Sequence, residues 1–278
     1  MRIGILTVGV LVLVGGQVRP FAGQLPLDPF RETGQSATPA YEGWYPNDDG
    51  TFTLAFGYFN RNLEETLDVP VGPANFVAPG SANQGQPTHF LPGRHWGVFT
   101  VTVPADFGGQ RVVWTLSSNG ETFAIPGHLH NDWLIDALHD PASGNEPPAI
   151  RFKPGGPEGR GPTGLTTGKQ TSVGVPLGLS VIGRDDLVRR PTDIPYGPPD
   201  RPVMTTTWIL HQGPGAVRFD ETMLSISDAS GTTHTTVTFD IPGDYVLRVA
   251  VHDYSGVEHA GHAQCCWTNG YVNVRVTE

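Results

Sequence analysis

The chain has only two cysteines among its 278 residues, and they are adjacent, at Cys265 and Cys266. Two neighbouring cysteines that pair with each other cannot staple distant segments, so a disulfide-rich scaffold is excluded. Lysine is equally scarce, and acidic side chains outnumber basic ones by 27 to 17. Such a surface repels nucleic acid and anionic lipid, so we expect no nucleic-acid partner.

Long apolar runs are missing after the N-terminus. The one run, Ile3 to Val14, follows Arg2 and precedes small residues, which is the pattern of a secretory signal peptide. A membrane helix needs ~20 residues, so we expect residues 1–23 to be removed, with cleavage between 16 and 23, and no transmembrane span to remain. The alternative to a signal peptide is that this apolar run forms a buried N-terminal strand. The signal predicts a secreted or periplasmic protein with a net charge near −12 after cleavage.

A 3.6-residue apolar period is also absent from the mature chain, so we expect helices only as short turns. A period of two takes its place. It is clearest in Phe52, Leu54, Phe56 and Tyr58, and it returns in 97–103 and 111–116. Asn119-Gly120 then predicts a hairpin turn. We assign 24–39 to an N-terminal extension and 40–138 to a first β-sandwich domain.

The alternation stops over residues 139–170, where the stretch 154–162 is dominated by glycine and proline. Such a stretch sustains neither a helix nor a sheet ladder, so we predict a linker. Alternation resumes in 171–278, with strands expected in 173–181, 203–210, 234–239, 245–251 and 272–276. The predicted fold is all-β, with two tandem β-sandwich domains joined by this Pro/Gly-rich linker.

The second half resembles an immunoglobulin-like sandwich of the PKD or cadherin type. The resemblance rests on a Val/Leu strand, Trp208, the phrase Pro242-Gly243-Asp244-Tyr245-Val246-Leu247-Arg248-Val249 and the closing strand 271–276. It implies that Trp208 is the core tryptophan of the third strand and Tyr245 the corner tyrosine that opens the sixth. Leu247 stands where antibody domains carry their second core cysteine. The whole chain is also similar to uncharacterised secreted bacterial proteins with a Cys-Cys-Trp-Thr-Asn segment near the C-terminus.

Around the two cysteines, three interpretations compete. His259, His262, Cys265 and Cys266 form a plausible ligand set for copper or zinc. In an oxidising compartment the cysteines could instead form a vicinal disulfide, although neighbouring Cα atoms lie closer together than in most disulfides. In the third interpretation they are small packed residues that stay reduced.

A second candidate site is a loop face. If the sandwich assignment holds, the cysteine segment and residues 183–202 form loops at the same end of the second domain. Long loops inside a compact domain are often functional. The residues we select for a binding face are Asp185, Asp186, Asp193, Tyr254 and Trp267. Their aspartates could also hold calcium, or simply be solvated charges.

The first domain offers weaker candidates. His128 and His130 are two residues apart and resemble half of a zinc or copper site, or else an ordinary surface strand. Four aromatic residues could stack on sugars or serve only in packing: Trp44, Tyr45, Trp96 and Trp133.

No nucleophile elbow, His-Glu-x-x-His, phosphate loop or dinucleotide fingerprint is present in the sequence. Our first hypothesis is therefore an extracytoplasmic, non-catalytic binding module for an extracellular polymer or protein. The second is a periplasmic copper- or zinc-handling protein that uses the His/Cys loop. The third is a secreted hydrolase whose site carries no known motif.

Overall fold

The structure, a computed structural model, describes residues 31–141, 143–188, 202–253 and 265–278. The predicted signal peptide lies outside these ranges, as do the candidate residues Asp193, Tyr254, His259 and His262. The described ranges form 17 strands and one 3₁₀ turn. Nothing helical within them has the length and apolar character needed to cross a membrane.

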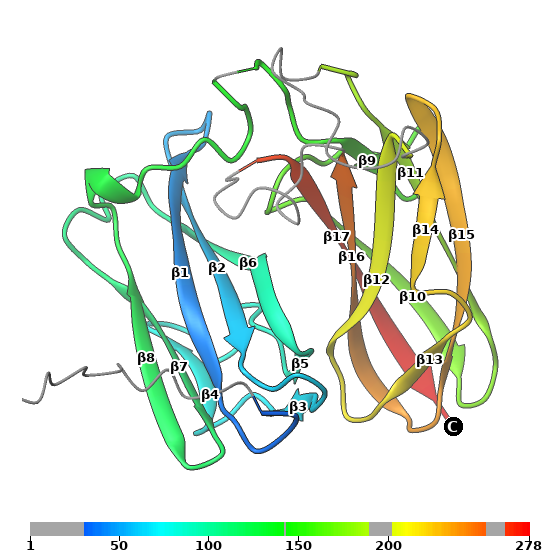
Figure 1. Cartoon of the computed structure of the whole chain (residues 1–278), viewed down its shortest axis with the longest axis horizontal. Helices are drawn as coiled ribbons and strands as arrows, with labels where there is room; N and C mark the ends of the chain where they lie inside the picture. The colour runs from blue at the N-terminus through cyan, green and yellow to red at the C-terminus, as the bar shows by residue number, and fades with distance from the viewer. Residues whose placement is uncertain (1–30, 142, 189–201, 254–264) are drawn as a thin grey trace, which may run out of the picture.

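The first domain is a sandwich of two antiparallel three-stranded sheets (Figure 1). One sheet has the order β1-β2-β6 and the other β4-β7-β8, while β3 and β5 form a short separate pair. The elements are β1 (Ala37–Pro46), β2 (Phe52–Asn60), β3 (Leu67–Asp68), β4 (Asn75–Ala78), β5 (His89–Phe90), β6 (Gly93–Val103), β7 (Val112–Ser118), β8 (Glu121–Gly127) and the 3₁₀ turn η1 (Asn131–Trp133).

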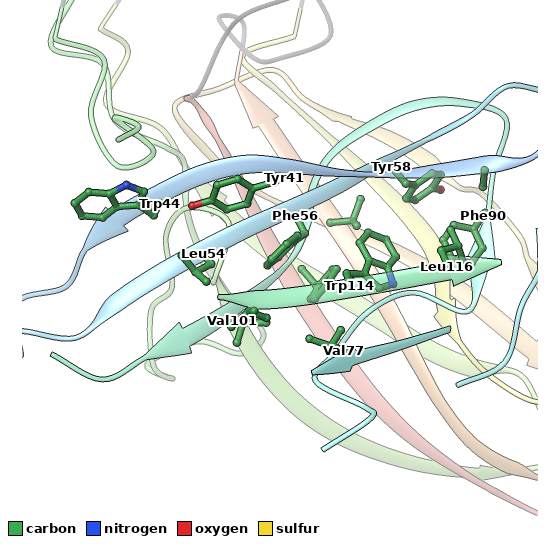
Figure 2. Close-up of a cluster of buried hydrophobic side chains, with 14 of the residues drawn as sticks. Tyr41, Trp44, Leu54, Phe56, Tyr58, Val77, Phe90, Val101, Trp114 and Leu116 are labelled. Atoms are coloured by element: carbon green, nitrogen blue, oxygen red, sulfur yellow. The ribbon is translucent and has the colours of Figure 1, made fainter. Parts of the chain in front are cut away.

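Aromatic side chains fill the space between these two sheets (Figure 2). Leu54, Phe56 and Tyr58 point inward from β2, as the alternation predicted, and all three are buried. Trp114 on β7 meets Phe99 edge-on with ring centres 5.0 Å apart. The predicted hairpin is also confirmed, because Asn119 and Gly120 take φ angles of 46° and 80° between the paired strands β7 and β8.

The second domain is a larger sandwich, with sheets ordered β10-β17-β16-β12-β14 and β13-β15-β11-β9. Its strands are β9 (Ala149–Arg151), β10 (Leu165–Ser172), β11 (Leu177–Arg184), β12 (Met204–Gln212), β13 (Val217–Phe219), β14 (Met223–Ile226), β15 (Ser230–Phe239), β16 (Gly243–Asp253) and β17 (Trp267–Thr277). Strand β10 runs parallel to β17, and every other pairing in the two sheets is antiparallel.

This arrangement is immunoglobulin-like. Strands β11 and β15 pair in one sheet, while β12, β16 and β17 lie together in the other. Trp208 on β12 is buried in the core at 1% exposure. The Tyr245 hydroxyl donates a 2.8 Å hydrogen bond to the Ile241 carbonyl, which is the tyrosine corner that the resemblance implied. The chain is therefore all-β and built of two β-sandwich domains.

Two strands of the second domain arise from the segment 139–170, which the sequence predicted as linker. Strand β9 pairs with β11, and β10 pairs with β17. Neither strand alternates clearly in sequence, because β9 has only three residues and β10 is an edge strand with mostly polar side chains. Gly164 lets the chain enter the sheet, since its φ is +59° and an added Cβ would collide with the Asn269 carbonyl.

Candidate functional site

The two domains are docked face to face rather than strung along a linker. Leu247, Val249, Val272 and Val274 point from β16 and β17 into the second domain's core. The residues between them belong to the opposite face, which an antiparallel sheet usually leaves in water. Here the first domain covers that face, so β17 lies beside β6 in the middle of the molecule (Figure 1).

Asn269 is the polar centre of this interface. It is fully buried, and its Nδ2 donates to the carbonyl oxygens of Gly97 in the first domain (2.7 Å) and Pro162 in the connection (2.8 Å). Its Oδ1 accepts a 3.1 Å bond from Arg248 Nη1. One side chain thus joins three separate segments.

Arg248 carries a charge into the same interface. Its side chain is only 4% exposed, and no carboxylate in the described residues forms an ion pair with it. Burial lowers the pKa of its guanidinium, while the phenols of Tyr271 and Tyr58 oppose that shift. A buried cation without a counter-ion disfavours any further positive charge nearby.

Two histidines next to Arg248 are held neutral. Burial, assisted by Arg248, lowers the pKa of His211 to about 3, although its bond to the Gly85 carbonyl acts in the opposite direction. Burial likewise lowers the pKa of His95 to about 4, with smaller contributions from Arg248 and Arg94. His95 belongs to the first domain and His211 to the second, so each domain places one unprotonated imidazole in the interface.

Gly97 is a point of tight contact between the domains. Its φ is +46°, and an added Cβ would collide with the indole of Trp267. Trp267 is 4% exposed and packs with Trp96, which itself lies under the Arg94 guanidinium at 3.8 Å. Only glycine satisfies both the backbone angle and the space.

We predict that Gly97→Ala lowers the free energy of unfolding by about 2–4 kcal/mol, because it combines the strain of a positive φ with overpacking. The matched control is Gly108→Ala. Gly108 has a similar φ of +55°, but its added Cβ would make only ordinary van der Waals contact. Urea unfolding followed by tryptophan fluorescence should show a smaller loss for the control of about 1–2 kcal/mol. Equal losses would remove the argument for a tight contact at Gly97.

Beside this interface the two domains leave an open cleft of about 470 Å³, a volume typical of small-molecule sites. The first domain contributes Asn83, Gly85, Phe99 and Thr100, the connection Thr163, and the second domain Thr166, His211, Gln212, Val246, Tyr271 and Asn273. Most of these side chains are hydroxyls, amides or aromatic rings. The cleft therefore exists only when the domains are docked.

Hydrogen bonds across the cleft fix its walls. His211 Nε2 donates to the Gly85 carbonyl at 2.6 Å, and Gln212 Nε2 donates to the Gln86 carbonyl at 2.5 Å. The Thr163 hydroxyl lies 2.8 Å from the Tyr45 hydroxyl and 3.3 Å from that of Thr100. The Tyr271 hydroxyl donates to the Val98 carbonyl at 2.9 Å. Both domains and the connection are thus tied together around the opening.

The cysteines selected from the sequence form a disulfide with each other in the structure. Both are buried, and their sulfur atoms lie 3.8 Å and 3.5 Å from the Asn145 carbonyl oxygen. Cysteines bonded in this way offer no thiolate to copper or zinc. Within the described ranges, no group of three or more His, Cys, Asp or Glu side chains could hold a metal ion.

Of the other residues selected for the loop face, the structure describes Asp185, Asp186 and Trp267. Asp185 is buried, and its Oδ1 accepts a 2.7 Å bond from the Leu187 amide. Asp186 is exposed and accepts from the Glu146 and Val188 amides. Trp267 was expected on an exposed binding loop, but it begins β17 and is buried against Gly97. It packs in the interface because its strand begins where the first domain covers the sheet.

Some of the first-domain candidates lie together, but they form no metal-ligand group among the described residues. The rings of His128 and His130 lie 6.1 Å apart, and Trp44 Nε1 donates to the His130 carbonyl as part of the packing. Trp96 packs in the interface, as described above, and Tyr45 bonds to Thr163. Trp133 alone of the four aromatic residues is substantially exposed, at 43%.

Sequence reasoning missed the cleft, although it carries a signal. In 271–276, polar residues alternate with buried valines, and this pattern is ordinarily that of a solvated sheet face. What distinguishes this face is its Asn269, Tyr271 and Asn273, where charged side chains are more usual. Thr163 and Thr166 lay in the predicted linker and Asn83 in a loop, so no local pattern linked them.

Comparisons with known proteins add little to this description. No protein family and no curated protein matches the chain. Among solved structures, the D00-D0 domain of Intimin is similar over 86% of this chain and 99% of its own, with 9% identity and a TM-score of 0.28. The D0-D1 domain of Intimin matches 87% of this chain and 98% of its own, at 11% identity and a TM-score of 0.27.

Domains 4 and 5 of the S-layer protein SbsC match 61% of this chain and 66% of their own, at 8% identity and a TM-score of 0.25. Superposition this weak carries no argument. The assignment of two β-sandwiches depends on the strand order, the tyrosine corner and the two cores described above.

Proposed function

We propose that the protein is a secreted, non-catalytic binding protein whose ligand site is the cleft between its two docked sandwiches. The observation that carries this proposal is the composition of the cleft, which both domains and the connection line with neutral hydroxyl, amide and aromatic side chains. Concave sites that combine aromatic surface with a few fixed polar groups are the usual form of a binding site.

The chemistry of the lining favours binding over catalysis. Of the described residues that line the cleft, only His211 and Tyr271 titrate. His211 has its pKa lowered to about 3 and its Nε2 hydrogen engaged by Gly85, while burial raises the pKa of Tyr271. A general acid–base pair needs pKa values near the working pH. The pKa of His211 lies far below neutral pH and that of Tyr271 lies far above it.

Export is supported by two further features. The N-terminal sequence has the charge and apolar run of a secretory signal. The bond between Cys265 and Cys266 belongs to an oxidising compartment such as the periplasm or the cell exterior.

Hydrogen exchange of the full mature chain tests the site. We would compare the free protein with samples containing neutral hexasaccharides, heparin or a mixed hexapeptide library. The proposal expects at least one class to protect amides in Thr163–Thr167 and Gly270–Asn273, and mass spectrometry to recover that compound unchanged. Protection confined to other segments, or consumption of the compound, would contradict the proposal.

A further inference from the structure

We propose that the ligand of the cleft is an uncharged, hydroxyl-rich saccharide. This inference rests on the proposed binding function and adds the chemical class of the ligand. The charge of the cleft, its hydrogen-bonding groups, its aromatic wall and its position on the sheet all favour this class of ligand.

The charge of the cleft excludes ionic ligands. Among the cleft-lining residues that the structure describes, none is Asp, Glu, Lys or Arg. Phosphate, sulfate and carboxylate groups are normally held by Arg or Lys through charge-assisted bonds. The nearest buried cation, Arg248, does not line the cleft and directs its Nη1 at Asn269. An anionic ligand would therefore lose its hydration without gaining a counter-ion.

The hydrogen-bonding groups match those of a sugar. Hydroxyl and carboxamide side chains both donate and accept, as sugar hydroxyls do. Strands β10 and β17 place Thr166 opposite Tyr271, and Asn273 two residues further along. In the part of the chain that the structure describes, neither the Thr166 hydroxyl nor the Asn273 amide bonds to a protein group, and both residues are exposed. These groups are therefore available to a ligand.

Tyr271 supplies an aromatic wall between these two polar groups. Its ring stands 5.5 Å from that of His211 in an edge-on arrangement, and its hydroxyl is anchored on the Val98 carbonyl. A ring fixed in this way offers a flat apolar surface at little entropic cost, which suits the C–H face of a pyranose. Polar groups beside an ordered ring are thus the combination that a sugar ring requires.

The position of the cleft disfavours an extended peptide. Peptides that bind β-sandwiches usually add to an unpaired strand edge. The free edge of β10 is bordered by a different pocket of about 310 Å³, lined by Phe152, Lys153 and Leu165 among others. The cleft instead opens over the face of the sheet, where side chains rather than backbone groups are presented.

The experiment measures binding of cellohexaose, maltohexaose and chitohexaose to the full mature chain by titration calorimetry, with heparin and the hexapeptide library in parallel. Thr166→Trp should fill the cleft and abolish binding of the preferred hexasaccharide. Asn273→Ala should weaken that binding about fivefold to tenfold, the loss expected for one neutral hydrogen bond. The matched control is Thr236→Trp, because Thr236 is an exposed strand threonine on β15, in the other sheet.

Each result decides between the two proposals. A neutral hexasaccharide that binds the wild type and the Thr236→Trp variant, but not Thr166→Trp, supports the inference. Thr166 also borders the pocket that holds Lys153 and Lys169, whereas Asn273 lines only the cleft. If only heparin or peptides bind, and both Thr166→Trp and Asn273→Ala weaken that binding, the saccharide inference is wrong and the binding cleft stands. If no probe binds in a way that depends on Thr166, both proposals fail.

Discussion

Replacing Asn269 with alanine is expected to lower the free energy of unfolding by about 3–6 kcal/mol. The substitution removes three buried hydrogen bonds and leaves the Gly97 and Pro162 carbonyls and the Arg248 guanidinium short of partners. Each buried polar group left unsatisfied costs about 1–3 kcal/mol, and more when it is charged. Because the lost bonds join the domains, urea unfolding should also separate into two transitions.

Asn273→Ala is the matched control for this prediction. Asn273 lies on the same strand, four residues away, but it is exposed. Its replacement should change stability by no more than about 0.5 kcal/mol. An Asn269→Ala protein that unfolds in one step, with the midpoint of the control, would show that the interface does not depend on this side chain.

Acidification is expected to destabilise the docked domains between pH 6.5 and pH 4. His211 and His95 have folded-state pKa values of about 3 and about 4, below the unfolded value of about 6.5. The unfolded chain therefore binds protons first as the pH falls, and stability that is fully present above pH 6.5 is lost toward the folded pKa values. Each histidine contributes up to about 1.4 kcal/mol per pH unit in this range.

The charges around these histidines explain the size of the effect. A proton on either ring would be added beside Arg248, and beside Arg94 as well for His95. The phenols of Tyr58 and Tyr271 face the same guanidinium and have raised pKa values, so they provide no negative charge. Glu42 pairs with Arg94 at 2.6 Å, but no carboxylate among the described residues pairs with Arg248.

Urea unfolding at pH 7, 5.5 and 4 measures the acid effect, with His211→Gln as the test variant. Glutamine keeps an N–H donor for the Gly85 carbonyl but does not titrate, so the variant should lose about half of the acid sensitivity. Comparing the variant with the wild type cancels the contributions of carboxylates. Glu42 is one of these, because burial raises its pKa. His234→Gln, an exposed change on β15, should leave the pH dependence as in the wild type. An unchanged slope in His211→Gln would contradict the prediction.

The sequence allowed the strands and cores to be predicted, because each sheet has a face whose residues alternate with a period of two. Leu54, Phe56 and Trp208 were placed correctly on this basis. The second face of β2 was not predicted. Its Thr53 and Ala55 are also buried, and Ala55 packs with Tyr45, Ile135 and Ala137. Small or polar residues give no local sign that another segment will cover them.

The candidate site was harder to predict for a related reason. Histidines, cysteines and aspartates attract attention because their chemistry is local, whereas the cleft is made of ordinary threonines, amides and one tyrosine. Its components are separated by as many as 190 residues in sequence, from Asn83 to Asn273. Only the docking of the two domains brings them together. Arg248 illustrates the difficulty. An arginine between the core residues Leu247 and Val249 indicates a solvated face, and yet this one is buried.

The parallel pairing of β10 and β17 has a mechanical consequence. Strand β10 follows the short strand β9 at the start of the second domain, and β17 ends that domain beside it in the same direction over eight residue pairs. A pulling force applied between the first domain and Thr277 would act along these strands in opposite directions. It would load the hydrogen bonds between them together, in shear, instead of peeling them apart in turn.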